Sequence, residues 1–154
     1  MRKFGAIRRL DLRRDVVKVK ILFLCVANSA RSQMAEGLAR KIFGAAVEIQ
    51  SAGSDPSGKV HPLAIQVMKE MGIDISVHRS KSWEELPPQF FIGLNYVITL
   101  CAEEICPVIA VKAEKLNWGM PDPAAGDLER DRLEAFRKTR DAIHTRLLEF
   151  RRSQ

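Results

Sequence analysis

Residues 25–32, CVANSARS, decide the fold of this chain together with the apolar run VKVKILFL at positions 17–24. The apolar run predicts a buried strand. Residues 29–43 repeat apolar side chains at helical spacing and stop before Gly44, which predicts an amphipathic helix. A strand that passes through a loop of small residues into a helix is the start of an α/β unit.

The rest of the chain also alternates strands with helices. Further strands are expected at 47–52, 95–100 and 115–118, and further helices at 62–71, near 82–85, and at 127–152. This alternation is typical of a parallel sheet with helices on both faces. We therefore expect an α/β three-layer sandwich, with a four-stranded parallel sheet in flavodoxin-like order and flanking helices.

The excess of basic over acidic residues lies at one end of the chain. Residues 1–20 contain eight basic and two acidic residues, which accounts for the whole formal net charge of +6. We expect residues 1–17 to be a basic N-terminal extension and residues 18–154 to form a single domain. The extension could attach to nucleic acid or to a membrane, but we favour a solvated segment. No nucleic-acid partner is expected for the core.

The composition favours a cytoplasmic protein. The chain has no run of about 18 apolar residues and no signal-peptide pattern. Its three cysteines do not have the spacing of a small secreted domain, which indicates a reducing compartment. We expect no membrane partner and a monomer.

Cys25 and Arg31 are placed to hold an oxyanion against a thiolate, the reactive form of cysteine. The backbone N–H groups of the loop and the positive end of the following helix can surround an anion, and Arg31 adds a planar pair of donors. Ser32 could donate to the thiolate, and Asn28 could brace the loop. The alternative is that Cys25 is a buried structural cysteine and that Arg31 lies near it by chance. The candidate oxyanion ligands are Val26, Ala27, Asn28, Ser29, Ala30, Arg31 and Ser32.

Two further cysteines follow the third predicted strand. Cys101 comes directly after that strand, as Cys25 does after the first. If the two strands are neighbours, both thiols face one cleft at the carboxyl ends of the sheet. Cys106 lies five positions further on. The alternative is that Cys101 and Cys106 are simply buried in the core.

Asp122 lies between Pro121 and Pro123, which stiffen the backbone around its carboxyl group. A carboxylic acid near a bound anion can protonate a departing oxygen; otherwise the segment is a plain turn. The three histidines, His61, His78 and His144, have no metal-ligand spacing, so no metal is expected. We favour a solvated loop for residues 78–80 over a segment that borders the site.

At these residues the chain resembles the low-molecular-weight protein tyrosine phosphatase superfamily, and within it the thioredoxin-coupled arsenate reductases. The resemblance covers about residues 18–152. It rests on Cys25-x5-Arg31-Ser32 with the following QMAEG, on residues 51–53 (SAG), 99–101 (TLC) and 106–107 (CP), and on the WG…DP segment at 118–123.

The resemblance implies an arsenate reductase, an enzyme of arsenical resistance, with Asp122 as general acid. Cys25 would attack arsenate, for which phosphate or sulfate are mimics, and Cys101 would then attack Cys25 and release arsenite. Cys106 would attack Cys101, leaving a Cys101–Cys106 disulfide for thioredoxin to reduce. No cofactor is implied.

The spacing of Cys101 and Cys106 carries a geometric consequence. If the segment between them is helical, their Cα atoms lie about 8–9 Å apart, whereas disulfides rarely span more than about 7 Å. The segment would then have to unwind to close the disulfide.

The main alternative is a phosphatase of the same superfamily. It would hydrolyse phosphotyrosine or small phosphoesters with Cys25, Arg31 and Asp122 alone. Such phosphatases usually have an aromatic residue after the Asp-Pro pair, but here Ala124 and Ala125 follow, so tyrosine recognition is poorly supported. A third alternative is a regulatory anion-binding module attached through the basic extension.

Overall fold

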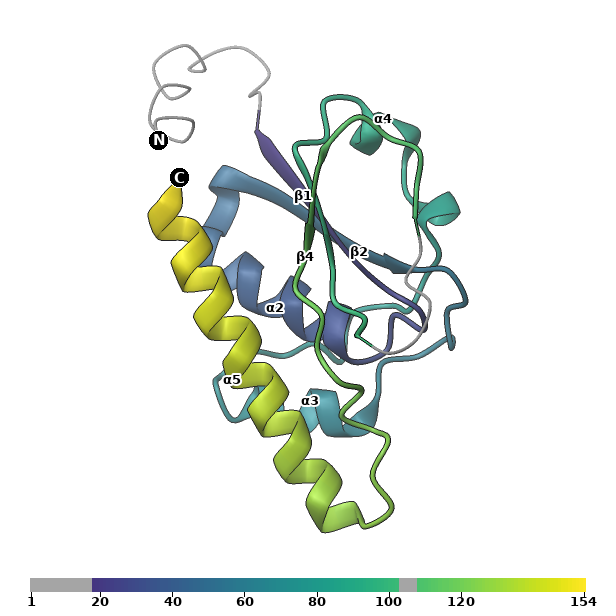
Figure 1. The fold of residues 1–154 in the computed structure, drawn as a ribbon, viewed down its shortest axis with the longest axis vertical. Coiled ribbons are helices and arrows are strands. Elements are labelled where there is room, and N and C mark those ends of the chain that lie inside the picture. The colour runs from purple at the N-terminus through teal and green to yellow at the C-terminus, as the bar shows by residue number, and fades with distance from the viewer. Residues whose placement is uncertain (1–17, 103–107) are drawn as a thin grey trace.

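The structure, a computed structural model, describes residues 18–102 and 108–154. The strands are β1 (Val19–Cys25), β2 (Val47–Gly53), β3 (Tyr96–Thr99) and β4 (Glu114–Asn117). The helices are α2 (Arg31–Phe43), α3 (Pro62–Lys69), α4 (Pro88–Phe91) and α5 (Glu129–Ser153), with the short 3₁₀ helices η2 (Gly44–Ala46) and η3 (Trp83–Glu85) (Figure 1). The expected strands and longer helices all form, with bounds shifted by at most two residues.

The four strands form one parallel sheet in the order β2-β1-β3-β4. β1 is central and almost wholly buried, as the apolar run at 21–24 predicts for a strand covered on both faces. β4 is the exposed edge. The expectation of a four-stranded parallel sheet with flanking helices is confirmed.

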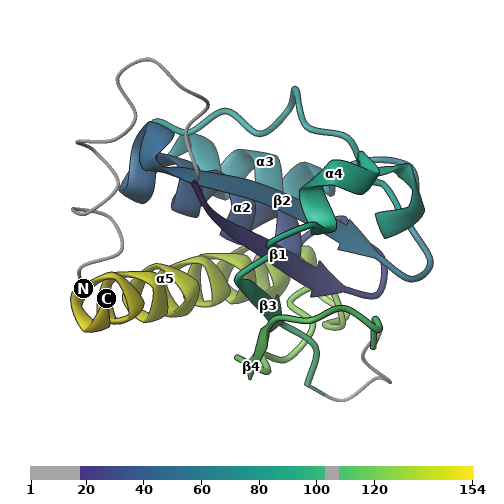
Figure 2. The ribbon, with the colours of Figure 1, turned by 90° about the horizontal axis from the view of Figure 1, so that it is seen from above.

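Alternate side chains of β1 enter two separate cores. Ile21 and Phe23 face the larger core, which is built from α2, α3 and α5 (Figure 2). Leu22 and Leu24 face the smaller core, where the sheet is covered by the segment of η3 and α4. The sequence reading missed α4, because a helix of four residues that begins at the second of two prolines is too short for a periodic signal.

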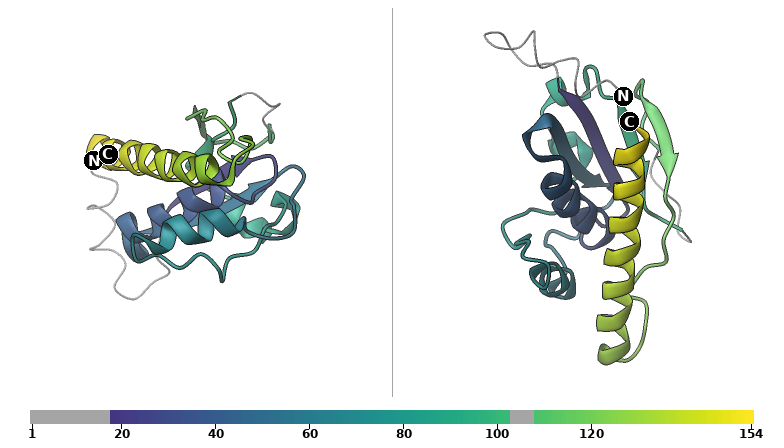
Figure 3. Two further views of the ribbon diagram at one scale, coloured as in Figure 1. Left: turned by 90° about the horizontal axis from the view of Figure 1, so that it is seen from below. Right: turned by 90° about the vertical axis from the view of Figure 1, so that its left-hand side faces the viewer.

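The long helix α5 runs beside the sheet and extends past its carboxyl edge (Figures 1 and 3). Its last turn returns to the start of β3, where the Tyr96 hydroxyl donates to Gln154 Oε1 at 2.8 Å. Near its middle, Arg137 and Arg140 bind the Glu70 carboxylate at the end of α3, each at 2.7 Å. These contacts hold α5 at its C-terminal end and near its middle. Its first turns lie next to the segment that follows β4. None of the described helices is long and apolar enough to cross a membrane.

The carboxyl ends of the strands bring the first two cysteines together. Cys25 ends β1, and β1 is paired with β3, so the two strands expected to be neighbours are neighbours. The pairing continues past β3, since the Leu100 N–H donates to the Leu24 carbonyl at 2.9 Å. Cys101 therefore emerges beside Cys25. Cys106 and the spacing argument for residues 101–106 fall on a segment that lies outside the described residues.

Candidate active site

The oxyanion loop, residues 26–30, connects β1 to α2 and turns its carbonyl groups outward. Four of these carbonyls accept backbone hydrogen bonds of 2.8–3.0 Å. The donors are the N–H groups of Asp55, Ser57, His61 and Met34, and the acceptors are the carbonyls of Val26, Ala27, Ser29 and Ala30. Because N–H and C=O point in opposite directions across a trans peptide, the amides that follow these carbonyls face the inside of the loop. That arrangement is a nest for an anion.

The first turn of α2 adds to this nest. Within the part of the chain that the structure describes, α2 has no side-chain cap at its N-terminus and no acidic residue in its first turn. The positive end of the helix dipole is thus left for an anion. Arg31, the first residue of the helix, is 6% exposed, and its Nη1 donates to the Met120 carbonyl at 2.8 Å. The guanidinium therefore links the oxyanion loop to the segment that carries Asp122.

Ser32 provides a hydrogen bond to the candidate nucleophile. The Cys25 sulfur and the Ser32 Oγ are 2.9 Å apart, and Asn28 Nδ2 donates to the same oxygen at 2.7 Å. Since the Ser32 oxygen accepts from Asn28, its own hydrogen is available for the sulfur. A hydroxyl that donates to sulfur stabilises the thiolate form.

Asn28 braces the loop from inside, as expected. It is fully buried and has a φ of 49°, a left-handed conformation that asparagine tolerates better than most residues. Its Oδ1 accepts from the Lys81 N–H at 2.9 Å and from Gln33 Nε2 at 3.0 Å. These bonds orient the amide so that Nδ2 donates to Ser32 and, at 3.0 Å, to Ser51 Oγ.

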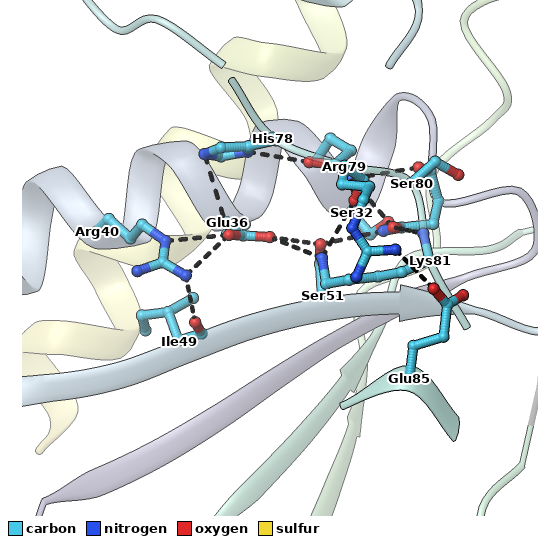
Figure 4. Close-up of polar contacts among 12 residues, drawn as sticks. Ser32, Glu36, Arg40, Ile49, Ser51, His78, Arg79, Ser80, Lys81 and Glu85 are labelled. Atoms are coloured by element: carbon cyan, nitrogen blue, oxygen red, sulfur yellow. Dashed lines mark hydrogen bonds and ion pairs between the residues drawn. The ribbon is translucent and has the colours of Figure 1, made fainter. Parts of the chain in front are cut away.

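The hydrogen bonds continue from Asn28 through Ser51 to a buried carboxylate, Glu36. Figure 4 shows Glu36 with Ser51, Arg40 and Lys81 around it. Ser51 Oγ donates to Glu36 Oε1 at 2.5 Å, and Glu36 is only 4% exposed. Its charge is balanced by Arg40 Nη2 at 2.9 Å and Lys81 Nζ at 3.7 Å. The oxyanion loop is thus supported by a polar network that ends in compensated charges, as a buried carboxylate requires.

Residues 78–81 contact this network, so the expectation of a solvated loop for residues 78–80 is wrong for His78 and Ser80, although the Arg79 side chain is exposed. Ser80 is buried, and its hydroxyl donates to the Ala27 carbonyl at 3.0 Å. His78 Nδ1 lies 3.0 Å from Gln33 Oε1, and its Nε2 lies 4.0 Å from Glu36. Burial lowers the pKa of both His78 and Lys81, and the Glu36 carboxylate opposes each shift. The sequence reading missed Gln33, Glu36, Ser51 and Lys81 as parts of the site.

Two glycines permit close backbone approaches around the site. A Cβ on Gly53 would collide with the Val26 carbonyl, so only glycine lets β2 end against the oxyanion loop. A Cβ on Gly119 would lie 2.9 Å from the Cys101 carbonyl oxygen. The backbone of the segment that leads to Asp122 therefore contacts the backbone at Cys101.

Asp122 is itself exposed, but it lies between two buried residues, Met120 and Pro123. Its Oδ1 accepts from the Ala124 N–H at 2.9 Å, and its carbonyl accepts from the Ala125 N–H at 3.2 Å, which makes a local turn. A cavity of about 430 Å³ lies between residues 119–123 and the side of α5 that carries Ala135 and Thr139. The segment is anchored at the buried Met120, whose N–H donates to the Leu100 carbonyl at 3.0 Å and whose carbonyl accepts from Arg31.

The structure thus gathers four of the five candidate catalytic residues on neighbouring elements at the carboxyl edge of the sheet. Cys25 and Cys101 are both buried thiols, Arg31 starts the adjoining helix, and Asp122 is two residues from the carbonyl that Arg31 binds. Among the described residues no cluster of histidine, cysteine or acidic side chains could hold a metal ion. The arrangement can place a tetrahedral oxyanion against a sulfur nucleophile, with an acid and a second thiol nearby.

Comparison with known proteins agrees with this geometry. Residues 20–153 match the model of the low molecular weight phosphotyrosine protein phosphatase family. The chain belongs to this family. A member from Halalkalibacterium halodurans, an arsenate reductase, is 38% identical over 136 residues, which cover 86% of this chain and 95% of that protein.

Solved structures of family members have the same fold. An arsenate reductase in a phosphate-binding state superposes with a TM-score of 0.69 and 33% identity, over 86% of this chain and 95% of that one. The thioredoxin-dependent arsenate reductase of Corynebacterium glutamicum has a TM-score of 0.64 and 29% identity, over 89% of this chain and 64% of that one. The fold of this chain is therefore that of the low-molecular-weight phosphatases, as the motifs indicate.

Proposed function

We propose that this protein is an arsenate reductase that converts arsenate to arsenite with Cys25, Cys101 and Cys106. The observation that carries the proposal is the placement of a second thiol, Cys101, at the end of the strand next to the one that ends in Cys25. A phosphatase needs only one cysteine, whereas a reductase must supply two electrons, which two thiols give by forming a disulfide. The arsenate reductases among the relatives support the same assignment.

The reaction begins in the oxyanion loop. Arsenate is held by the loop amides and Arg31, and the Cys25 thiolate attacks arsenic. An As–O bond breaks as an S–As bond forms, and Asp122 gives a proton to the departing oxygen, which leaves as water. Ser32 stabilises the thiolate before the attack, since its hydroxyl lies 2.9 Å from the sulfur.

Reduction follows when Cys101 attacks the Cys25 sulfur. A Cys25–Cys101 disulfide forms, the S–As bond breaks, and its electron pair stays on arsenic, which leaves as arsenite. Cys106 then attacks Cys101, which frees Cys25 and leaves a Cys101–Cys106 disulfide. Thioredoxin, the electron donor named for the relative from Corynebacterium glutamicum, reduces this disulfide.

The proposal includes the setting of the reaction. A thioredoxin-coupled relay works in a reducing compartment, so we place the protein in the cytoplasm. We further propose that residues 18–154 act as a monomeric domain without nucleic acid or membrane as partner, and that residues 1–17 are an accessory basic extension.

A single-turnover experiment tests the relay. The reduced protein is incubated with arsenate in the absence of thioredoxin, arsenite is quantified, and disulfides are mapped by mass spectrometry. We expect about one arsenite per protein and a Cys101–Cys106 disulfide, with Cys25–Cys101 trapped in the Cys106→Ser variant. If no arsenite forms and Cys101 and Cys106 stay reduced, the proposal fails.

The second candidate is a phosphatase, because the oxyanion loop, Arg31 and Asp122 are complete without the second thiol. Hydrolysis of an aryl phosphate at a rate that survives Cys101→Ser and Cys106→Ser would favour this activity. Salt-sensitive binding to DNA that is lost on deletion of residues 1–17 would instead support an anion-binding module.

A further inference from the structure

Cys101 contacts the acid segment, residues 119–123, through the backbone on both sides of its α-carbon. The Leu100 carbonyl, in the peptide unit before Cys101, accepts from the Met120 N–H at 3.0 Å. The Cys101 carbonyl, in the peptide unit after it, lies against Gly119, where an added Cβ would come within 2.9 Å of that oxygen. The acid segment therefore contacts both peptide units that flank the second thiol.

These two contacts fix the backbone from which the Cys101 side chain projects. Each peptide unit is planar, so the backbone at Cys101 has only two soft rotations, one about each bond that joins its α-carbon to a flanking unit. A rotation about either bond turns one unit relative to the other, and it changes the bond to Met120 or the contact with Gly119. The backbone of Cys101 therefore keeps its direction as long as the acid segment stays in place.

Space, rather than backbone conformation, requires glycine at position 119. Gly119 is not among the described glycines with positive φ, so its backbone conformation is open to other residues. A Cβ at this position would nevertheless be too close to the Cys101 carbonyl oxygen. That oxygen belongs to the backbone, so it cannot swing aside as the end of a flexible side chain can. Any larger residue at 119 must displace either the acid segment or Cys101.

Met120 extends this arrangement to the anion site. Its carbonyl accepts from Arg31 Nη1 at 2.8 Å, while its N–H binds the peptide unit before Cys101. Met120 is buried, and Asp122 follows it by two positions. The backbone of the second thiol is thus linked through one residue to the candidate oxyanion ligand Arg31.

We propose that Gly119 is a positioning residue for the second thiol: because it has no side chain, the acid segment packs directly on the backbone of Cys101 and holds the thiol within reach of Cys25. The inference rests on the proposed function, in which Cys101 attacks the Cys25 sulfur. The step that forms the disulfide then depends on the packing of the acid segment as well as on the two cysteines.

Thiol–disulfide exchange measures this step without arsenate. The Cys106→Ser protein is mixed with one equivalent of dithiodipyridine, so that a thiolate of the pair bonds to one sulfur of the reagent and a first pyridinethione leaves. The other thiol then attacks the protein sulfur of this mixed disulfide. The Cys25–Cys101 disulfide forms, and the second pyridinethione leaves. The absorbance of pyridinethione follows both releases.

We expect Gly119→Ala to slow the second release about tenfold, as a small misplacement of a reacting group does, and to leave the first within about twofold. Gly126→Ala is the matched control, because the one described atom that its Cβ would meet is the Arg132 Cγ, at an ordinary 3.6 Å. This control should leave both releases unchanged. If Gly119→Ala does not slow the second release relative to the first, the inference is overturned. If the wild type forms no arsenite, the proposed function fails, but the exchange still reports on Gly119.

Hydrogen exchange tests the contact in the wild type, where the fold is intact. We expect the Met120 N–H to exchange within about tenfold of the Leu100 N–H, which is bonded to β1, and the N–H of the exposed Ala125 to exchange about 100-fold faster or more. Exchange of Met120 as fast as that of Ala125 would show that the acid segment does not hold Cys101. This outcome would overturn the inference even if Gly119→Ala fails to fold.

Discussion

The oxyanion loop and the acid segment, residues 119–123 with Asp122, lie side by side but are built in opposite ways. In the loop, Asn28 is fully buried, as is Ser32 in the helical turn that follows, and the loop carbonyls accept bonds from other segments. In the acid segment, Asp122 is exposed, and the bonds around it are those of a local turn. The difference indicates that the fold itself organises the candidate anion site, whereas the proposed proton delivery would depend on one exposed side chain.

Replacement of the nucleophile should give the largest effect and separate binding from chemistry. We expect Cys25→Ser to reduce arsenite formation by about 10⁴-fold or more. Phosphate should still bind with a Kd within about threefold of the wild type by calorimetry, because the loop amides and Arg31 remain. Loss of phosphate binding in this variant would show that the loop depends on the sulfur for its shape. Cys101→Ser should bind phosphate normally and stop before the disulfide.

Removal of the acid should affect chemistry alone. Asp122→Asn is expected to lower the rate of the first step about 10²–10³-fold, the contribution typical of a general acid. Because Asp122 is exposed and its hydrogen bonds to described residues stay within its own turn, Tm and phosphate affinity should not change. A fall of several degrees in Tm would contradict the contrast between the two regions.

Removal of the brace should affect folding and binding together. Asn28→Ala deletes four hydrogen bonds between buried groups and leaves alanine in a left-handed conformation, so the free energy of unfolding should fall by about 3 kcal/mol. Urea denaturation measures this loss, and calorimetry should show weaker phosphate binding. Asn28→Gly removes the backbone strain but still lacks the four hydrogen bonds. Asn117→Ala, a substitution at an exposed position, is the control. If Asn28→Ala is as stable as the wild type, Asn28 does not brace the oxyanion loop.

The smallest effect is expected far from both regions, at Glu70. Hydrogen bonds from Arg137 and Arg140 lower the pKa of Glu70 from 4.5 to about 2. Its stabilising contribution is therefore complete above pH 4.5 and lost as the pH falls toward 2. Glu70→Gln should cost less than about 1 kcal/mol at pH 7, and less still at pH 3, in urea denaturation. A change in kcat at pH 7 would mean that the link between α3 and α5 also supports the acid segment.

The parts of the site that lie on one continuous stretch could be predicted from the sequence. Residues 25–32 join a strand to a helix, so their local pattern already defines the loop and its anion-binding chemistry. Cys101 could be placed because parallel strands meet at their carboxyl ends. The order of the strands, which makes β3 the neighbour of β1, follows from packing and was only a condition in the sequence argument.

The supporting residues could not be predicted, because their roles arise from contacts between distant segments. Glu36 reads as an ordinary polar position of an amphipathic helix, yet every residue of α2 from Arg31 to Ala39 is buried. Lys81 belongs to an irregular stretch without periodicity and meets Glu36 only in the folded chain. Polar residues that become buried through tertiary packing carry no local signal.

The pairing of β1 with β3 has a kinetic consequence for the proposed relay. Adjacent strands run about 4.8 Å apart, and the residue before Cys101 is bonded to the residue before Cys25, so the backbones that carry the two thiols are held close together. Well-oriented intramolecular groups react as if at effective concentrations of about 10⁵ M or more. Cys101 would therefore outcompete any thiol in solution for the Cys25 adduct, and the enzyme would complete the reduction before it needs an outside partner.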